Sequence, residues 1–197
     1  MQNLSQLKQW RRAVDPAVEL AGFDPRTGLA GRDLLLARLE QQWAFCTKQQ
    51  LNICLLLINI SRFSLVRRQR GEDIDSTLLA VGHVVSRALR RRADFAGHIR
   101  AGEFSAILAD VTPDGARHVA GTMIEAVRQA KIPLPGAPTQ CVRVCVGGAC
   151  FVPTPHHFSK TLLTQADQAL DEARGQGGDC AVVYDMGDHP DLARGGW

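Results

Sequence analysis

The sequence predicts an α/β fold in which a mixed central β-sheet is flanked by helices on both faces. Residues 51–60 (LNICLLLINI) form a continuous, branched apolar run, the pattern of a strand buried on both sides. Two short apolar segments, residues 95–99 and 104–108, flank a polar turn and are spaced as a β-hairpin. Helical patterns alternate with these strands, and the order β-α-α-β-β-α-β-α-β indicates this fold class.

The N-terminal half of the chain contains three helical patterns. Residues 1–22 are predicted as a helical lead-in, because apolar side chains recur at helical spacing and Asp15-Pro16 is typical of a helix restart. A turn over residues 24–29 precedes an amphipathic helix over residues 32–43. A further helix is predicted over residues 73–92. Its apolar side comprises Leu78, Leu79, Val81, Val84, Val85 and Leu89.

In the C-terminal half, helices are predicted over residues 113–130 and 160–174. Residues 140–152 alternate as one strand, in which Val142, Val144 and Val146 share a side. A last strand follows over residues 180–184. We therefore expect a domain over residues 23–185 and a flexible tail over residues 186–197, which is rich in glycine and aspartate.

Composition excludes several classes of protein. The longest apolar run is far shorter than the roughly 20 residues that cross a bilayer, and the N-terminus has no apolar signal segment. We therefore expect a cytoplasmic protein with no membrane insertion and with reduced cysteines. The six cysteines show no zinc-site spacing, so no metal site is expected. A net charge of +3 is too small to indicate binding to a nucleic acid polymer.

The basic residues are strongly biased toward arginine. Of 23 cationic side chains only four are lysines, which leaves 19 arginines. A genome rich in G and C explains most of this bias, because it favours arginine codons. Arginine is also the side chain suited to bidentate contacts with phosphate or guanine. The excess is therefore informative only where an arginine falls at a defined position.

Three motifs give the chain a family resemblance. Residues 24–29 (DPRTGL) with Arg32, residues 166–170 (ADQAL) with Ala173-Arg174, and the hairpin at residues 100–104 (RAGEF) follow one another on the expected elements. In this order they resemble the GGDEF domain family, the diguanylate cyclases. The resemblance covers residues 23–185 and implies a fold like that of GGDEF domains and nucleotidyl cyclases. The family condenses two GTP molecules into cyclic di-GMP with the help of two metal ions.

The chain departs from the family pattern where catalysis would occur. Asn59 and Ser61 replace acids at the end of the first strand, and Gly102 replaces an acid of the hairpin, which leaves Glu103 as its one acid. The resemblance therefore implies a degenerate member without cyclase activity, catalytic residues or cofactor. The degenerate positions are Asn59, Ser61, Arg67, Ser76, Arg100, Ala101, Gly102 and Glu103. Among them, Arg100 and Ala101 replace glycines, and Arg67 and Ser76 replace residues that recognise guanine.

A second family site survives. Many members bind their product through an R-x-x-D motif, and residues 91–94 (RRAD) match it with Arg91 and Asp94. The resemblance implies that these two residues bind cyclic di-GMP and that the signal passes to an unidentified protein partner. A second copy of the chain, bridged by the ligand, is another candidate partner. Three alternatives remain open: a solvated helix end at the arginine run, a nucleotide-independent interaction or dimerisation module, and a cyclase with unusual ligands.

Overall fold

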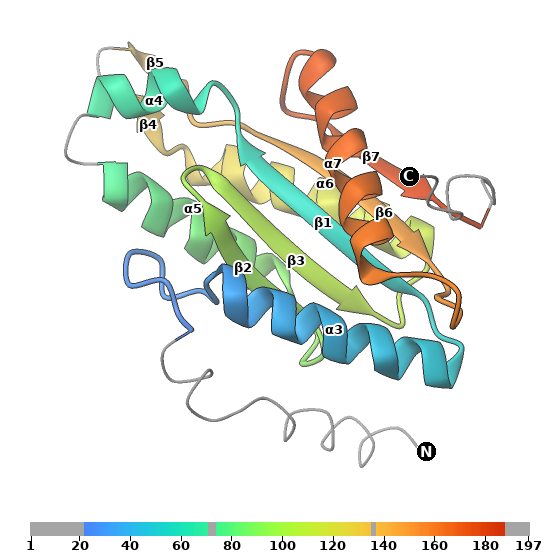
Figure 1. The fold of residues 1–197 in the computed structure, drawn as a ribbon. Helices are drawn as coiled ribbons and strands as arrows, with labels where there is room; N and C mark the ends of the chain where they lie inside the picture. Colours follow the sequence, from blue (N-terminus) through green and yellow to red (C-terminus); the bar gives the residue numbers. More distant parts are fainter. Residues whose placement is uncertain (1–21, 71–73, 135–136, 188–197) are drawn as a thin grey trace.

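The computed structural model describes residues 22–70, 74–134 and 137–187, and it confirms the α/β fold class (Figure 1). A five-stranded mixed sheet has the order β2-β3-β1-β6-β7, in which β7 runs parallel to β6 and the other neighbours are antiparallel. The strands are β1 (Ile53–Ile60), β2 (Phe95–Arg100), β3 (Glu103–Ala109), β6 (Val144–Phe151) and β7 (Ala181–Asp185). A separate pair is formed by β4 (Pro133–Leu134) and β5 (Ala137–Cys141).

Helices cover both faces of this sheet (Figure 1). One face packs against α3 (Arg32–Gln49) and α7 (Ser159–Gly175). The other face packs against α5 (Ile74–Ala88) and α6 (Pro113–Ala130), and the short helix α4 (Phe63–Arg70) adds Val66 to that layer. The helix over residues 113–130 has the predicted bounds, because Thr112 caps its first turn and Pro113 begins it.

The central strand β1 is buried on both faces, as its unbroken apolar run predicted. Alternate residues contribute to opposite layers of the core: Cys54, Leu56, Ile58 and Ile60 pack with α5 and α6, whereas Ile53, Leu55 and Leu57 pack with α3 and α7. This is the two-residue period of a strand. The central position of β1 places Asn59, its last residue but one, between β3 and β6.

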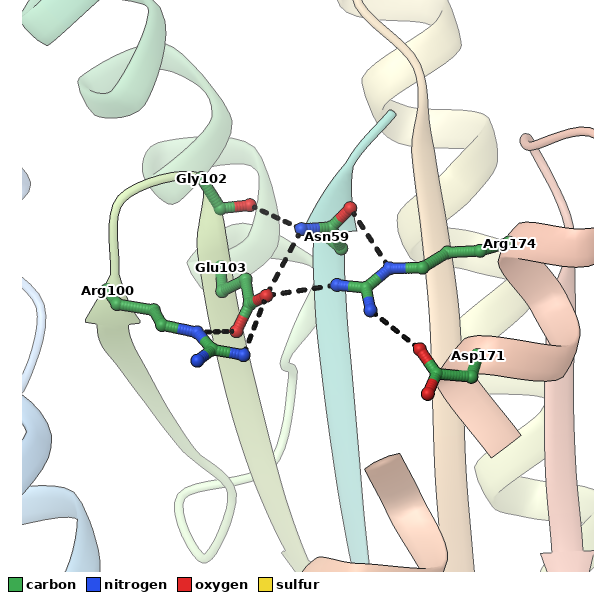
Figure 2. Close-up of polar contacts among 6 residues, drawn as sticks. All are labelled: Asn59, Arg100, Gly102, Glu103, Asp171 and Arg174. Carbon is green, nitrogen blue, oxygen red and sulfur yellow. Dashed lines mark hydrogen bonds and ion pairs between the residues drawn. The ribbon is translucent and has the colours of Figure 1, made fainter. Parts of the chain in front are cut away.

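Helix α7 lies unusually close to the sheet at Gly147 on β6. A Cβ atom at this position would lie 2.0 Å from the backbone nitrogen of Leu170, so only glycine allows the contact. The close approach anchors α7 across β6 and β1. As a result, the C-terminal turn of α7, which carries Arg174, lies beside the end of β1 (Figure 2).

Three local predictions were wrong. The strand predicted over residues 140–152 is interrupted, because the Val142 backbone N–H donates to Ile132 (2.8 Å) while the main sheet begins again at Val144. The helix predicted over residues 73–92 ends at Ala88, where the chain turns toward β2. Leu79 was assigned to its apolar side but is 51% exposed, because Leu78 and Val81 already fill the contact with the sheet.

The two predicted extensions are described only in small part. The helical lead-in at residues 1–22 lies outside the described residues except for Gly22, and so does the tail beyond residue 187. Met186 is buried and its backbone N–H donates to Cys150 (3.0 Å). Within the described ranges, no helix combines the length and apolar character needed to cross a bilayer. All six cysteines are free thiols.

Candidate functional site

The β2–β3 hairpin and the end of β1 meet at one edge of the sheet. The strand register places Asn59 opposite Glu103, and Glu103 pairs with Arg100 across the hairpin. Figure 2 shows these side chains converging with Arg174, which reaches them from α7. The structure therefore brings together four of the degenerate positions, namely Asn59, Arg100, Gly102 and Glu103.

Glu103, the one acid left in the hairpin, is held between two guanidinium groups. Its Oε2 atom accepts from Arg100 Nε at 2.5 Å, and its Oε1 atom accepts from Arg100 Nη2 at 3.1 Å and Arg174 Nη2 at 2.9 Å. The hydrogen bond with Glu103 raises the pKa of Arg100. Both carboxylate oxygens are thus engaged in charge-assisted hydrogen bonds.

Arg174 links Glu103 to the end of β1 and to its own helix. It donates to Asn59 Oδ1 at 3.4 Å and to Asp171 Oδ1 at 2.8 Å. If the Asn59 amide is rotated by half a turn, it accepts from Arg174 at 3.2 Å and donates to Ile60 at 3.1 Å. Asn59 therefore serves as an acceptor for Arg174 in either orientation. The cluster contains two guanidinium groups, Arg100 and Arg174, and two carboxylates, Glu103 and Asp171. Its net charge is therefore zero.

The residues at this edge do not fit the pair of divalent metal ions that the family chemistry requires. Mg²⁺ prefers anionic oxygen ligands, and carboxylates normally supply them. Asn59 offers only a neutral carbonyl, while both oxygens of Glu103 are already bonded to guanidinium groups. In the described part of the chain, no three His, Cys, Asp or Glu side chains converge as a metal site.

Gly102 has a structural role in the hairpin turn. Its φ angle is +77°, a left-handed conformation that favours glycine, and its carbonyl accepts from the Ile60 N–H at 2.8 Å. A Cβ atom here would lie 2.5 Å from ring atoms of Phe63. An acidic side chain at this position would therefore be destabilising, because of the backbone conformation and because of the phenyl ring of Phe63.

The other degenerate positions lie outside this cluster. The Ser61 hydroxyl is 3.4 Å from the Cys145 sulfur, and Ala101 is exposed in the hairpin turn. Arg67 on α4 and Ser76 on α5 are both exposed. No pair formed by an amide and a carboxylate stands at these two positions to bind a guanine edge.

Arg91 and Asp94 lie at the opposite end of β2, in the loop that follows α5. They form a turn in which the Asp94 N–H donates to the Arg91 carbonyl (3.1 Å). The exposed guanidinium of Arg91 donates to the Asp110 carbonyl at 2.9 Å. Asp94 is half-buried, and its Oδ1 atom has no hydrogen-bond partner. Burial raises the pKa of Asp94, and the nearby charge of Arg91 only partly offsets this effect.

Sequence reasoning did not identify Arg174 and Asp171 as site residues. Arg174 was noted only as part of the Ala173-Arg174 motif, because its partners are 71 and 115 positions away in sequence. A sequence signal for Arg174 was nevertheless present. A cation in the last turn of a helix is favoured by the helix dipole, and the last turn of α7 faces the end of the strand that α7 crosses.

The sheet order, with a hairpin turn beside the end of the central strand, defines an α/β domain built on a mixed five-stranded sheet. The family described as "Diguanylate cyclase, GGDEF domain" matches residues 21–180. The chain therefore belongs to the GGDEF domain family.

Individual relatives agree with this assignment. The probable diguanylate cyclase DgcC of Escherichia coli K12 is 26% identical over 155 residues, which cover 78% of this chain and 41% of the relative. The chain thus spans less than half the length of that protein. The coiled-coil and GGDEF domain of Caulobacter crescentus DgcB, solved with c-di-GMP, superposes with a TM-score of 0.77 at 18% identity, covering 91% of this chain and 94% of the solved DgcB chain. Pseudomonas aeruginosa SiaD, solved with its activator SiaC, gives 0.75 at 25% identity, covering 91% of this chain and 68% of the solved SiaD chain.

Proposed function

We propose that this GGDEF domain does not synthesise cyclic di-GMP but binds it through Arg91 and Asp94 and relays its presence to a protein partner. The observation that carries the proposal is the turn formed by these two residues. It places an exposed guanidinium beside a half-buried carboxyl group whose Oδ1 atom is buried without a hydrogen-bond partner. By contrast, Glu103, the one acid of the hairpin, has no unused carboxylate oxygen, because it is bonded to two arginines.

The chemistry of the turn suits a guanine dinucleotide. A guanidinium can donate two hydrogen bonds to the O6 and N7 atoms of guanine or to a phosphate. A carboxylate can accept from the N1 and N2 hydrogens of guanine, which would satisfy Asp94. Among structural relatives, DgcB was solved with c-di-GMP and SiaD with a protein activator, so both kinds of partner occur with this fold. These relatives support, in general terms, both the binding of cyclic di-GMP and the contact with a protein partner that we propose.

Calorimetric titration with cyclic di-GMP tests the binding site. We expect the wild-type protein to bind and Arg91→Ala to lose about tenfold or more in affinity, because a charge-assisted bidentate contact is removed. Arg92→Ala is the matched control, since Arg92 is exposed in the same run and carries the same charge. Silence of the wild type at tens of micromolar ligand would refute the proposal. Equal losses in the two variants would favour a merely solvated helix end.

The absence of cyclase activity is tested separately. We expect no cyclic dinucleotide when the protein is incubated with GTP and either Mg²⁺ or Mn²⁺ and the products are separated by chromatography. The reason is that Asn59 and the paired Glu103 offer no free anionic ligand at the hairpin edge. Sustained turnover would contradict this part of the proposal without affecting the binding test at Arg91.

A further inference from the structure

A cavity lies between α3 and α7, on the face of the sheet that these two helices cover (Figure 1). Its volume is about 400 Å³, which is in the range of small-molecule sites. The floor is formed by β1 and β2, and the lining extends to the hairpin residues Arg100 and Glu103. At one end the two helices are joined, because the Ser159 hydroxyl on α7 donates to the Glu40 carboxylate on α3. We call this cavity the leucine groove and define it by its leucines: Leu35, Leu36, Leu39, Leu55, Leu57 and Leu163.

Each helix contributes one regular stripe of side chains to the leucine groove. The stripe of α3 comprises Arg32, Leu35, Leu36 and Leu39. The stripe of α7 comprises Lys160, Leu163, Thr164 and Asp167. Both follow the spacing i, i+3, i+4, i+7, which places four side chains on the same side of a helix, and both begin with a cation. The walls of the groove are therefore regular helix faces rather than loops.

The interior of the leucine groove is aliphatic. Leu55 and Leu57 of β1 form its floor, and the neighbouring Leu36, Ile99 and Leu163 are only partly buried. Among the described residues, no aromatic side chain lines the groove. Nucleobases are typically held by stacking on aromatic rings or guanidinium planes, which this interior does not offer. An alkyl chain suits it better, because covering partly exposed aliphatic side chains removes apolar surface from water.

The rim of the leucine groove carries more positive than negative charge. Its charged residues are the cations Arg32, Arg100 and Lys160 and the acids Glu103 and Asp167. Glu103 is already bonded to two arginines. Within the described residues, no acid lies within ion-pair distance of Arg32 or Lys160. An anionic head group therefore complements the rim better than a cationic one does.

We propose that the leucine groove binds a free medium-chain aliphatic carboxylate, such as decanoate. The alkyl chain covers the leucines, and the carboxylate stays at the rim, where Arg32 and Lys160 attract it. Each stripe runs over about two turns of helix, or about 10 Å, so the groove suits a chain of medium length. The proposal goes beyond cyclic di-GMP recognition and does not depend on it, because Arg91 and Asp94 lie in the loop before β2, outside the groove.

Calorimetric titration of the full chain with sodium decanoate tests the ligand class. We expect the wild type to bind decanoate and to bind hexanoate at least about tenfold more weakly, because each methylene group lost from the groove costs about fourfold in affinity. Decyltrimethylammonium, which has the same chain but a cationic head, should also bind at least about tenfold more weakly. No binding of decanoate at about 1 mM, or equal affinity for the cationic probe, would overturn the proposal.

The variant Thr164→Trp tests the location of the site. Thr164 is an exposed residue of the α7 stripe, so a tryptophan side chain there would fill the groove without changing its charge. We expect decanoate affinity to fall about tenfold or more. The matched control is Gln168→Trp, an exposed position on the same helix outside the lining, which should keep the wild-type affinity. Unliganded melting temperatures establish that both variants fold, and equal affinities in the two would refute the groove as the site.

The double variant R32Q/K160Q tests the role of charge. At low ionic strength we expect a loss of about tenfold in decanoate affinity, because the two cations that attract the carboxylate are removed. The matched control is K48Q/R68Q, which removes the same charge from exposed positions outside the lining. Equal losses in the two double variants would show that only the net charge of the protein matters, and the proposed rim contacts would be wrong.

The two binding proposals fail separately. Arg91→Ala should retain decanoate affinity, and Thr164→Trp should retain cyclic di-GMP affinity. If Arg91→Ala abolished decanoate binding, the carboxylate would be bound at the Arg91 loop and the leucine groove would be refuted as its site. A decanoate affinity that falls as the protein concentration rises would identify a second copy of the chain as the occupant of the groove, which would also overturn the proposal.

Discussion

The carboxylates of Glu103 and Asp94, which lie near opposite ends of β2, differ in how fully they are hydrogen-bonded. At one end, Glu103 is satisfied by two arginines and has no free oxygen. At the other end, the Asp94 carboxyl is partly withdrawn from water without a full set of donors. Proteins rarely leave a buried carboxylate oxygen without a partner, because the cost of desolvation is not recovered. Such a residue is a better candidate for ligand binding than one that is already paired.

The raised pKa of Asp94 leads to a prediction for Asp94→Asn. Because the folded-state pKa lies above the unfolded value of 3.8, the ionised group lowers the stability of the fold above that pKa, and this penalty disappears below pH 3.8. We expect Asp94→Asn to be slightly more stable than the wild type at neutral pH and equally stable in acid. Urea denaturation at several pH values measures this difference. A variant that is less stable at pH 7 would contradict the interpretation.

Gly102 provides a prediction about the hairpin turn. Gly102→Asp restores an acid to the GGDEF position, yet it places a Cβ atom against Phe63 in a left-handed backbone. We expect a loss of about 3 kcal/mol in the free energy of unfolding, from backbone strain and overpacking together. Chemical denaturation measures it. Ala101→Asp, at the exposed neighbouring position, is the control and should change stability by less than about 1 kcal/mol.

At the scale of elements, the motif at residues 24–29 links the start of the domain to β2. The Oδ1 atom of Asp24 accepts from the Thr27 N–H (3.0 Å), the Thr27 hydroxyl (3.1 Å) and the Arg26 N–H (3.1 Å). The same atom lies 3.2 Å from Nδ1 of His98, which is buried on β2 and stacks on Phe104. The motif that suggested the family thus has a structural role here, since it fixes the loop before α3 against the sheet.

Asp24→Asn tests this link. Burial by itself would raise the pKa of Asp24, but the hydrogen bonds from His98 and Thr27 outweigh it and lower the pKa below 3.8. A carboxyl group with a lowered pKa stabilises the fold at pH values above its unfolded-state pKa. That stabilisation is lost as the pH falls through its folded-state pKa. We expect the variant to lose about 1–2 kcal/mol in the free energy of unfolding at neutral pH. Its difference in stability from the wild type should disappear in strong acid. Asp167→Asn, an exposed acid on α7, should show neither effect.

At the scale of the whole molecule, the hairpin-edge cluster joins β1, the β2–β3 hairpin and α7 into one neutral network (Figure 2). Arg174 places a positive charge where a metal ion would need negative ligands. The proposed lack of a metal site therefore rests on more than Asn59, because the surrounding arginines neutralise Glu103.

This leads to a prediction about restoring a metal ligand. We expect Asn59→Asp alone to gain no Mn²⁺ affinity, because Arg174 would pair with the new carboxylate as it does with Glu103. The double variant N59D/R174Q should bind Mn²⁺ measurably, since two neighbouring carboxylates would then lack that counter-charge. The electron paramagnetic resonance signal of free Mn²⁺ reports the binding, and R174Q alone is the control. Equal affinity in N59D and in the double variant would show that Arg174 does not block the site.

Much of the fold could be predicted from local pattern. The buried strand β1 and the helix over residues 113–130 follow from periodicity and capping, which depend on residues close in sequence. The interruption before Val144 could not be predicted, because the Val142 N–H bonds to Ile132, in a different part of the chain. Leu79 was misplaced because a helical pattern gives the width of an apolar face but not how much of it the sheet can cover.

The sequence by itself determined the fold class, the family motifs and the identity of the residues at the degenerate positions, because period, turn chemistry and motif order are local properties. The tertiary structure decided what those residues do. Strand register and the packing of α7 on Gly147 bring Asn59, Glu103 and Arg174 together. Side chains so distant in sequence meet only through the packing of the whole domain. For that reason the pairing of Glu103 and the unpartnered oxygen of Asp94 were visible only in three dimensions.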